Sequence, residues 1–335
     1  MSGRTERKGA RRRSEFDLIA RYFAPLSQGA PLAFGLLDDA AILRPRAGED
    51  LIITKDAIIE GVHFLPDDPP QSVAQKLLRV NLSDLAAKGA VPQAYLLATA
   101  WPNALPERWI AGFAKGLAKD QAAFGLALIG GDTVATPGPM MLSCTMIGRM
   151  ARGGMVKRSG ARPGDRVYVT GTIGDAYLGL LLLRGRIEGL RRSQARMLAA
   201  RYRVPEPRVA FGKVLPHLAS AALDVSDGLV ADAGHLATTS DCRITIRLDD
   251  VPASPAAHAV FERYPVHRAP SLAGGDDYEI LFTARPAKGR AVIEAARACK
   301  LRVTEIGRVE EGERVRLLDA GGSEIRLEKH GYTHF

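Results

Sequence analysis

The sequence predicts an α/β or α+β chain of two domains, and three observations support that prediction. Strand-like and helix-like patterns alternate in both halves of the chain. A length of 335 residues suggests more than one core. A stretch rich in Gly and Arg, "ARGGMVKRSGARPGD", separates the halves. We therefore expect a basic tail over residues 1–13, an N-terminal domain over 14–150, a linker over 151–165 and a C-terminal domain over 166–335.

In the N-terminal half, apolar spacing predicts the elements in order. "EFDLIARYFAPL" has the spacing of a helix, whereas "AFGLLDDAAIL" and "DLIITKDAII" read as strand ends that carry acids. "SVAQKLLRVNLSDLAAKGA" is helical, and "VPQAYLLATAWP" returns as a strand. A long helix, "PERWIAGFAKGLAKDQAAFG", precedes two strands around a Pro/Gly turn, "LALIGGDTVATPGPMMLSCTMIGRM".

The C-terminal half restarts with a strand, a Gly turn and a helix in "RVYVTGTIGDAYLGLLLL". A long helical region leads to a strand-to-helix turn in "LDVSDGLVADAGHLA". The segments "CRITIRL", "DDYEILFTA" and "VTEIGRV" read as strands, and a helix is expected near "GRAVIEAARACK".

Composition excludes several classes of protein. A hydrophobic fraction of 46% with 25% charged residues is typical of globular chains. No apolar run approaches the ~18 residues of a membrane span, and the basic N-terminus is not followed by an apolar signal region. The three cysteines are scattered without a CxxC pair, which favours a reducing cytoplasm. Walker A, GxGxxG, HExxH and GxSxG motifs are absent from the sequence.

The net charge of +9 is concentrated in the tail. Residues 1–13 contain six Arg or Lys and one Glu, so five of the nine charges lie there and the remaining chain carries +4. A solvated tail is the favoured interpretation, with contact to RNA or a membrane surface as the alternative. We expect neither nucleic acid nor membrane as a partner.

Carboxylates in apolar, Gly-rich surroundings are the chemical signal of this sequence. They occur in "GLLDDAAIL", "ITKDAIIEGVHF", "NLSDLAAKGA", "LIGGDTV", "LDVSDGL" and "LAGGDDYEILF". Buried carboxylates repel one another and need counter-charge, which Mg²⁺ supplies when it also binds substrate phosphates. Thr54 and Asp56 share one face if their segment is a strand, as a metal site needs. The pattern predicts Mg²⁺-dependent phosphate chemistry, although a single Asp before a helix is usually a cap and an adjacent Asp pair is commonly a solvated turn.

Ten segments together resemble the thiamine-monophosphate kinase family. They are "EFDLIARYF", "DDAAIL", "TKDAIIEGVHFLPD", "VNLSDLAAKGAVP", "LIGGDT", "RSGARPGDRVYVTGTIGDA", "DVSDGLVADAGHL", "GGDDYEILF", "IGRV" and "GYTHF". This family shares a superfamily with aminoimidazole ribonucleotide synthetase, selenophosphate synthetase and the hydrogenase maturation protein HypE. The resemblance implies the two-domain fold of that superfamily, with the N-terminal half forming a homodimer through a shared β-barrel. It also implies ATP-dependent, Mg²⁺-dependent, direct phosphorylation of thiamine monophosphate to thiamine diphosphate.

The resemblance implies a role for each matching residue. Metal or phosphate contacts fall on Asp38, Asp39, Thr54, Lys55, Asp56, Asp84, Asp132, Asp224 and Asp227. Contacts to ATP fall on Gly131, Asp132, Arg158 and Ser226, and contacts to the acceptor substrate fall on His63, Asp276 and Tyr332.

Three positions depart from the family pattern. Leu37 replaces a glycine, Lys55 replaces a threonine, and Asp276 stands where glutamate is common. None of these changes removes a metal carboxylate, so we expect an active enzyme. The alternatives are an aminoimidazole ribonucleotide synthetase-like ligase and a non-catalytic nucleotide- or RNA-binding protein.

Overall fold

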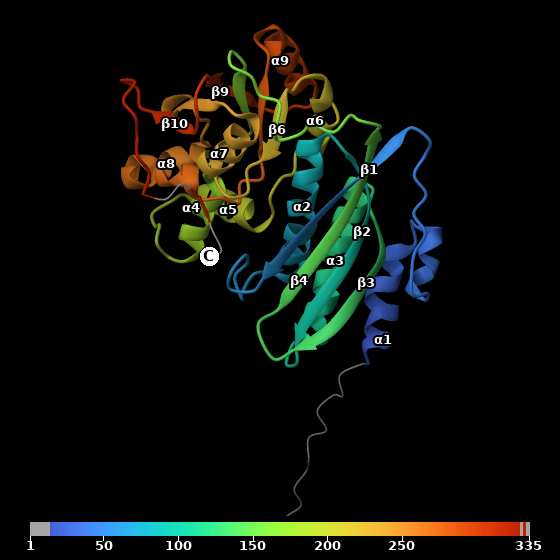
Figure 1. Cartoon of the computed structure of the whole chain (residues 1–335). Coiled ribbons are helices and arrows are strands. Elements are labelled where there is room, and N and C mark those ends of the chain that lie inside the picture. The colour runs from blue at the N-terminus through green and yellow to red at the C-terminus, as the bar shows by residue number, and fades with distance from the viewer. Residues whose placement is uncertain (1–13, 329–330, 333–335) are drawn as a thin grey trace, which may run out of the picture. The chain divides into compact units, whose positions relative to one another are not determined.

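The structure is a computed structural model that describes residues 14–328 and 331–332 (Figure 1). It contains two compact units. Unit 1 comprises Met1–Arg44, Ala57–Gln75 and Ala94–Cys144, and unit 2 comprises Pro45–Asp56, Lys76–Gln93 and Thr145–Phe335. The chain passes between the units several times, and the expected domain boundaries stay a prediction. The expected basic tail lies outside the described residues.

A four-stranded sheet has the order β1-β4-β2-β3. Its strands are β1 (Glu49–Ile59), β2 (Val91–Pro102), β3 (Ala127–Thr136) and β4 (Met141–Ala151). β2 and β3 are parallel, with Leu97 paired to Gly131. All four strands were expected from their apolar patterns, and the structure confirms them.

Within unit 1, β2 packs against α3 (Glu107–Phe124). The ring of Trp101 on β2 meets the rings of Phe113 and Trp109 edge-on, at centroid distances of 5.4 and 5.6 Å. Nearby, the Tyr95 hydroxyl donates a hydrogen bond of 3.3 Å to Gln121 Oε1. These aromatic contacts bury large apolar areas and fix α3 on the strand.

The first helical segment of unit 1 is also confirmed, in three short pieces. α1 (Glu15–Leu18) continues into the π-helix η1 (Ile19–Phe23) and the 3₁₀-helix η2 (Ala24–Ser27). The strand end expected in "AFGLLDDAAIL" is wrong. That segment forms the 3₁₀-helix η3 (Pro31–Leu36), and the described residues 37–44 contain no strand. Phe34 and Leu36 have φ values of +52° and +60°, which are incompatible with an extended chain.

α2 (Pro70–Lys88) is buried around most of its circumference. Leu77, Leu78 and Leu82 are fully buried although they point in different directions. Small residues let other backbone segments approach it within unit 2. A Cβ at Gly212 in α6 (Val209–Gly212) would lie 2.5 Å from the Ala86 carbonyl oxygen. This burial carries the acid of α2 into the interior.

Unit 2 contains a six-stranded sheet with the order β10-β7-β9-β5-β8-β6. Neighbouring strands are antiparallel, except that β10 runs parallel to β7. The strands are β5 (Arg166–Thr170), β6 (Ala221–Asp224), β7 (Arg243–Arg247), β8 (Ile280–Ala284), β9 (Val303–Glu310) and β10 (Val315–Leu318). Every strand but β10 was expected from the sequence.

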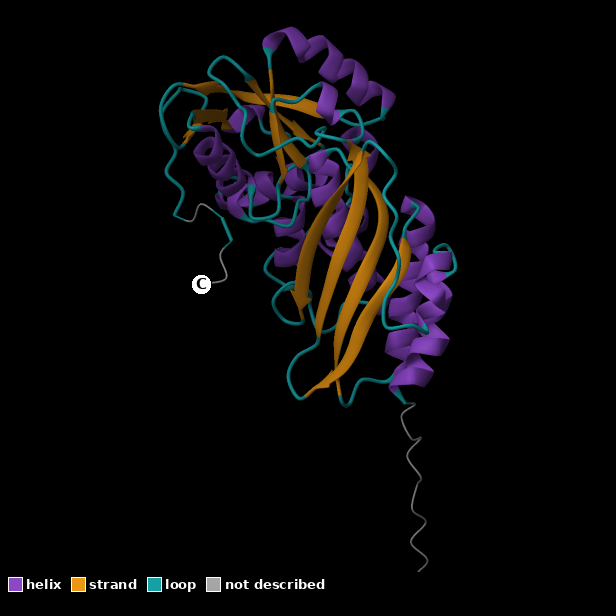
Figure 2. Cartoon of the chain, turned by 45° about the vertical axis from the view of Figure 1, so that its right-hand side comes forward, coloured by secondary structure: helices purple, strands orange, loops and turns teal. Residues whose placement is uncertain are grey.

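Helices cover both faces of this sheet (Figure 2). On one face, α7 (Leu229–Ser240) packs on a core that includes Val169 and Leu281. On the other face, Tyr168 and Phe282 stack at 5.3 Å, near α9 (Gly289–Ala298). A smaller apolar core joins α4 (Asp175–Leu183), α5 (Arg192–Arg203) and α8 (Pro255–Arg263).

The remaining elements of unit 2 are short 3₁₀-helices that connect the longer ones. They are η4 (Leu215–His217), η5 (Leu248–Asp250), η6 (Pro265–His267), η7 (Pro270–Ala273) and η8 (Pro286–Lys288). Among the described residues, no helix combines the length and apolar character that crossing a membrane requires.

Candidate active site

Three predicted metal carboxylates of unit 2 lie close together although they come from separate segments. Asp56 is on β1, Asp84 is in α2, and Asp224 ends β6. The Thr54 hydroxyl donates a hydrogen bond of 2.5 Å to Asp84 Oδ2. Thr54 and Asp56 share a strand face as expected, while the exposed Lys55 alternates to the other. We call Asp56, Asp84 and Asp224 the carboxylate cluster.

The pKa values of Asp56 and Asp224 reflect burial and neighbouring negative charge. Burial and then the charge of Asp84 raise the pKa of Asp56 to about 7. Burial, followed by Asp84, raises the pKa of Asp224 well above its ordinary value. Carboxylates that resist ionisation in this way hold charge only when a cation balances it. Their hard oxygen donors suit Mg²⁺, so the residues present fit the expected metal.

A second group of possible ligands follows β6. One ligand atom from each of Asp227, Asp232 and His235 lies within 4.8 Å of the others. Asp227 was predicted, whereas Asp232 and His235 were missed. Their spacing on α7, three residues apart, was a readable signal. Asp232 has a structural task as well, because its Oδ2 accepts hydrogen bonds from the N–H groups of Asp227 and Gly228 at 3.0 and 3.1 Å.

The loop between β6 and α7 also contacts two further predicted site residues, Asp276 and Tyr332. The carbonyl oxygen of Ser226 accepts a hydrogen bond of 2.8 Å from the Asp276 N–H. The N–H of Tyr332 donates one of 2.9 Å to the Asp227 carbonyl. This contact brings the exposed Tyr332, near the C-terminus, to the same loop.

Asp276 forms an ion pair that the sequence did not indicate. Its Oδ2 lies 2.9 Å from the Nζ atom of Lys76, a buried α2 residue. The Lys76 ammonium also lies over the Tyr202 ring, 4.0 Å from its centroid. The Tyr278 hydroxyl donates a hydrogen bond of 3.2 Å to Asp276 Oδ1. Both carboxylate oxygens of this predicted substrate contact are therefore held in place.

The backbone around Asp276 is strained. Asp276 and Tyr278 have φ values of +65° and +51°, which non-glycine residues rarely adopt. Hydrogen bonds of 2.8 Å to the carbonyls of Ser226 and Val225 hold their N–H groups. Such strain persists only where the surroundings enforce it.

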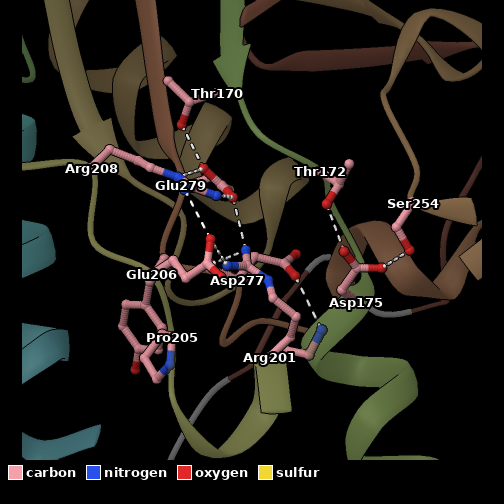
Figure 3. A network of polar contacts seen from close by, with 12 residues as sticks. Thr170, Thr172, Asp175, Arg201, Pro205, Glu206, Arg208, Ser254, Asp277 and Glu279 are labelled. Carbon is pink, nitrogen blue, oxygen red and sulfur yellow. Dashed lines mark hydrogen bonds and ion pairs between the residues drawn. The ribbon is translucent and has the colours of Figure 1, made fainter. Parts of the chain in front are cut away.

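A buried network behind this segment supplies that enforcement (Figure 3). Fully buried Glu279 accepts hydrogen bonds from Thr170 Oγ1 at 2.7 Å, from Arg201 Nη2 at 2.8 Å, and from Arg208 Nε and Nη2 at 2.7 and 2.5 Å. Half-exposed Glu206 pairs with both guanidinium groups. Glu279 was not a predicted site residue, although an acid inside the apolar "YEILF" was a visible signal.

The buried network around Glu279 also includes Asp277, the residue after Asp276. Fully buried Asp277 accepts hydrogen bonds from the N–H groups of Gly174 and Ala176, at 2.8 and 3.3 Å. Burial raises the pKa of Asp277 well above its ordinary value. These contacts tie the start of α4 to the non-helical, non-strand segment before β8 that carries Asp276.

Arg158 and Lys88 lie in unit 2 as well. Arg158 is exposed and lines an open hollow together with Lys88. Burial and then the charge of Arg158 lower the pKa of Lys88 to about 8, against the opposite influence of Asp224 and Asp84. The sequence did not indicate Lys88, because a lysine in the last turn of a helix is ordinary.

The predicted site residues of unit 1 come from several separate segments. Asp38 and Asp39 are exposed in the bend after η3. Asp132 is exposed on β3, and its Oδ1 accepts a hydrogen bond of 2.9 Å from the Thr133 N–H. Gly131 is explained by strand packing, since a Cβ there would lie 1.9 Å from the Leu97 carbonyl oxygen. His63 is half-buried, and its Nδ1 accepts a hydrogen bond of 3.1 Å from the Ile59 N–H, so Nε2 carries the ring proton of neutral His63.

Comparison with known proteins identifies the family. The model for the AIR synthase related protein N-terminal domain matches residues 37–150, and the model for the C-terminal domain matches 162–320. A thiamine-monophosphate kinase from Caulobacter vibrioides is 47% identical over 324 residues, covering 96% of this chain and 91% of its own length.

Solved structures agree. The thiamine-monophosphate kinase of Stenotrophomonas maltophilia K279a is 39% identical, with a TM-score of 0.82 over 91% of this chain and 96% of its own. AaThiL, solved in complex with AMPPCP and TMP, is 33% identical, with a TM-score of 0.77 over 90% of this chain and 96% of its own. The chain belongs to the thiamine-monophosphate kinase family of AIR synthase related proteins.

Proposed function

We propose that this protein transfers the γ-phosphoryl group of ATP directly to the phosphate of thiamine monophosphate, with Mg²⁺, and so forms thiamine diphosphate. The carboxylate cluster is the observation that carries the proposal. Three carboxylates from separate segments are gathered in a partly desolvated place, where they are costly without cations. Relatives of nearly the same length in this family are named for the same reaction.

The chain's own residues bind and orient the reactants. Asp56, Asp84 and Asp224 would hold the metal through carboxylate oxygens, and the Thr54 hydroxyl fixes the direction of the Asp84 carboxylate. Mg²⁺ held there would supply positive charge that offsets the negative charge of the phosphates during transfer. Since phosphoryl transfer depends mainly on positioning and charge, no protein nucleophile is needed.

Further contacts follow from the family match. We assign Asp38, Asp39, Lys55, Asp132 and Asp227 to metal and phosphate binding. Gly131, Arg158 and Ser226 are assigned to ATP. His63, Asp276 and Tyr332 are assigned to thiamine monophosphate, and the Lys76 ion pair fixes the direction in which Asp276 presents its carboxylate. The protein acts as a cytoplasmic homodimer in this proposal.

A direct assay tests the proposal. The purified protein is incubated with ATP, Mg²⁺ and thiamine monophosphate, and thiamine diphosphate is separated and quantified. Product that disappears with excess EDTA and returns with Mg²⁺ supports the proposal. Binding of ATP without product rejects it, and formylglycinamidine ribonucleotide is then the next substrate to test.

A further inference from the structure

Three cationic residues of unit 2 are among those that line one open hollow of about 530 Å³. Lys88, Lys157 and Arg158 line it together with Met155, Ser159 and Thr239, and none of these described lining residues is acidic. Like charges gathered at one place repel one another, and an anion between them relieves that repulsion. The hollow therefore has the electrostatic character of an anion site.

Two backbone hydrogen bonds fix Val156 and Lys157 beside the hollow. The Val156 N–H donates a hydrogen bond of 3.2 Å to the Lys88 carbonyl, so the segment is tied to the end of α2. The Ala222 N–H donates one of 2.9 Å to the Lys157 carbonyl, which ties the segment to β6. The segment that carries Val156 and Lys157 is thus tied to both α2 and β6.

A serine on α7 fixes the other side of the segment. Ser240 Oγ accepts hydrogen bonds of 3.2 Å from the N–H groups of Gly160 and Ala161, and lies 3.3 Å from the Arg158 carbonyl. Gly160 is needed there, because its φ is +127° and a Cβ would lie 2.5 Å from the Ser220 carbonyl oxygen. The backbone that follows Lys157 and Arg158 is therefore fixed as well.

Lys88 joins this hollow to the carboxylate cluster. It follows Asp84 by four residues, one helical turn, on the same side of α2. Its Nζ donates a hydrogen bond of 2.7 Å to the carbonyl of Ala222, two residues before Asp224. An ammonium group has three donors, and an anion in the hollow can accept from those that the Ala222 carbonyl does not use.

We propose that Lys88 is a nucleotide-binding residue whose ammonium contacts a phosphate oxygen of the nucleoside triphosphate, in a hollow that Lys157 and Arg158 complete. This inference rests on the proposed function, because the carboxylate cluster binds the same triphosphate through metal. A metal-bound triphosphate keeps net negative charge, and this hollow neutralises the part that faces away from the cluster.

The test measures binding rather than turnover. Isothermal titration calorimetry gives the dissociation constants of AMPPCP and of inorganic triphosphate, at saturating Mg²⁺, for the wild type and Lys88→Met. Methionine keeps the apolar stem and removes the charge. We expect both ligands to bind about tenfold to a hundredfold more weakly, because the lost contact is a charge-assisted hydrogen bond to phosphate.

Matched variants separate phosphate contact from general disturbance. Lys88→Arg keeps the charge and should recover most of the affinity. Lys288→Met, at an exposed lysine of η8 in the same unit, should leave both constants unchanged. A Lys88→Met protein with wild-type circular dichroism that binds both ligands within twofold of the wild type overturns the proposal.

Two further outcomes are informative. If Lys88→Met does not fold, Lys157→Met replaces it, because Lys157 is tied to β6 through its backbone carbonyl. Unchanged phosphate affinity in that variant then overturns the proposal, and weakened affinity supports it. Failure of the proposed function is distinguishable: a wild type that binds AMPPCP but forms no thiamine diphosphate rejects the reaction, while the comparison of dissociation constants still decides the role of Lys88.

Discussion

Replacing Glu279 by Gln tests how far the buried network stabilises unit 2. The substitution keeps the size of the side chain and removes the buried charge that pairs with both Arg201 and Arg208. Breaking a buried ion pair from one side costs about 3–5 kcal/mol, because the partner's charge stays buried without compensation. Glu206 still pairs with both arginines, at 3.4 and 3.1 Å, so we expect the lower end, a loss of about 3 kcal/mol in the free energy of unfolding.

The assay is urea unfolding followed by far-ultraviolet circular dichroism, at neutral pH and without nucleotide. Glu305→Gln is the matched control, since Glu305 forms an exposed pair with Arg166 on the same sheet, at 2.8 Å. The control should keep the wild-type midpoint, because exposed pairs are screened by water and salt. If Glu279→Gln loses less than about 1 kcal/mol, the charge of Glu279 does not hold the network, and our account of the strained Asp276 segment is refuted.

Three further predictions concern the site. Asp84→Asn should lower the rate of thiamine diphosphate formation more than about a hundredfold, because loss of a direct metal ligand should exceed the about tenfold to hundredfold loss seen for groups that only orient ligands. The metal-free protein should stay at least as stable, because one member of a crowded group of carboxylates becomes neutral. Normal turnover by a folded Asp84→Asn protein contradicts the metal role. His63→Ala should raise the KM for thiamine monophosphate and leave AMPPCP affinity nearly unchanged; the opposite pattern in titrations of the two ligands argues against a substrate contact. The folded pKa of Asp56, about 7, lies above the unfolded value, so its proton is bound more tightly in the folded state. The metal-free protein should therefore lose stability as pH rises from about 4 to 7, and Mg²⁺ affinity should rise up to about tenfold per pH unit over the same range; a flat profile in either titration disagrees with this assignment.

The local spacing of apolar residues was sufficient to predict most helices and strands. Strands β2, β3 and β4 and the helices α2 and α3 lie where apolar spacing placed them, because each has a period that only one regular structure buries. The segment after Phe34 was misread as a strand. Its apolar residues have the composition of a strand, but positive φ values at Phe34 and Leu36 turn the chain, and composition does not report those angles.

The short elements α8 and β10 were also missed, since a short run carries little periodic signal. β10 pairs with β7 through residues that are distant in sequence. Its identity as a strand therefore depends on the partner strand rather than on its own residues.

For the site, the sequence by itself indicated candidate acids and favoured a cation as their partner, because buried carboxylates need counter-charge or hydrogen bonds. Only the tertiary structure decided the groupings. Asp56, Asp84 and Asp224 meet because β1, α2 and β6 converge, and the same packing pairs Lys76 with Asp276 and encloses Glu279 between two arginines. Charges interact through space over distances that chain order does not encode, so partners far apart in sequence become identifiable only when the chain is folded.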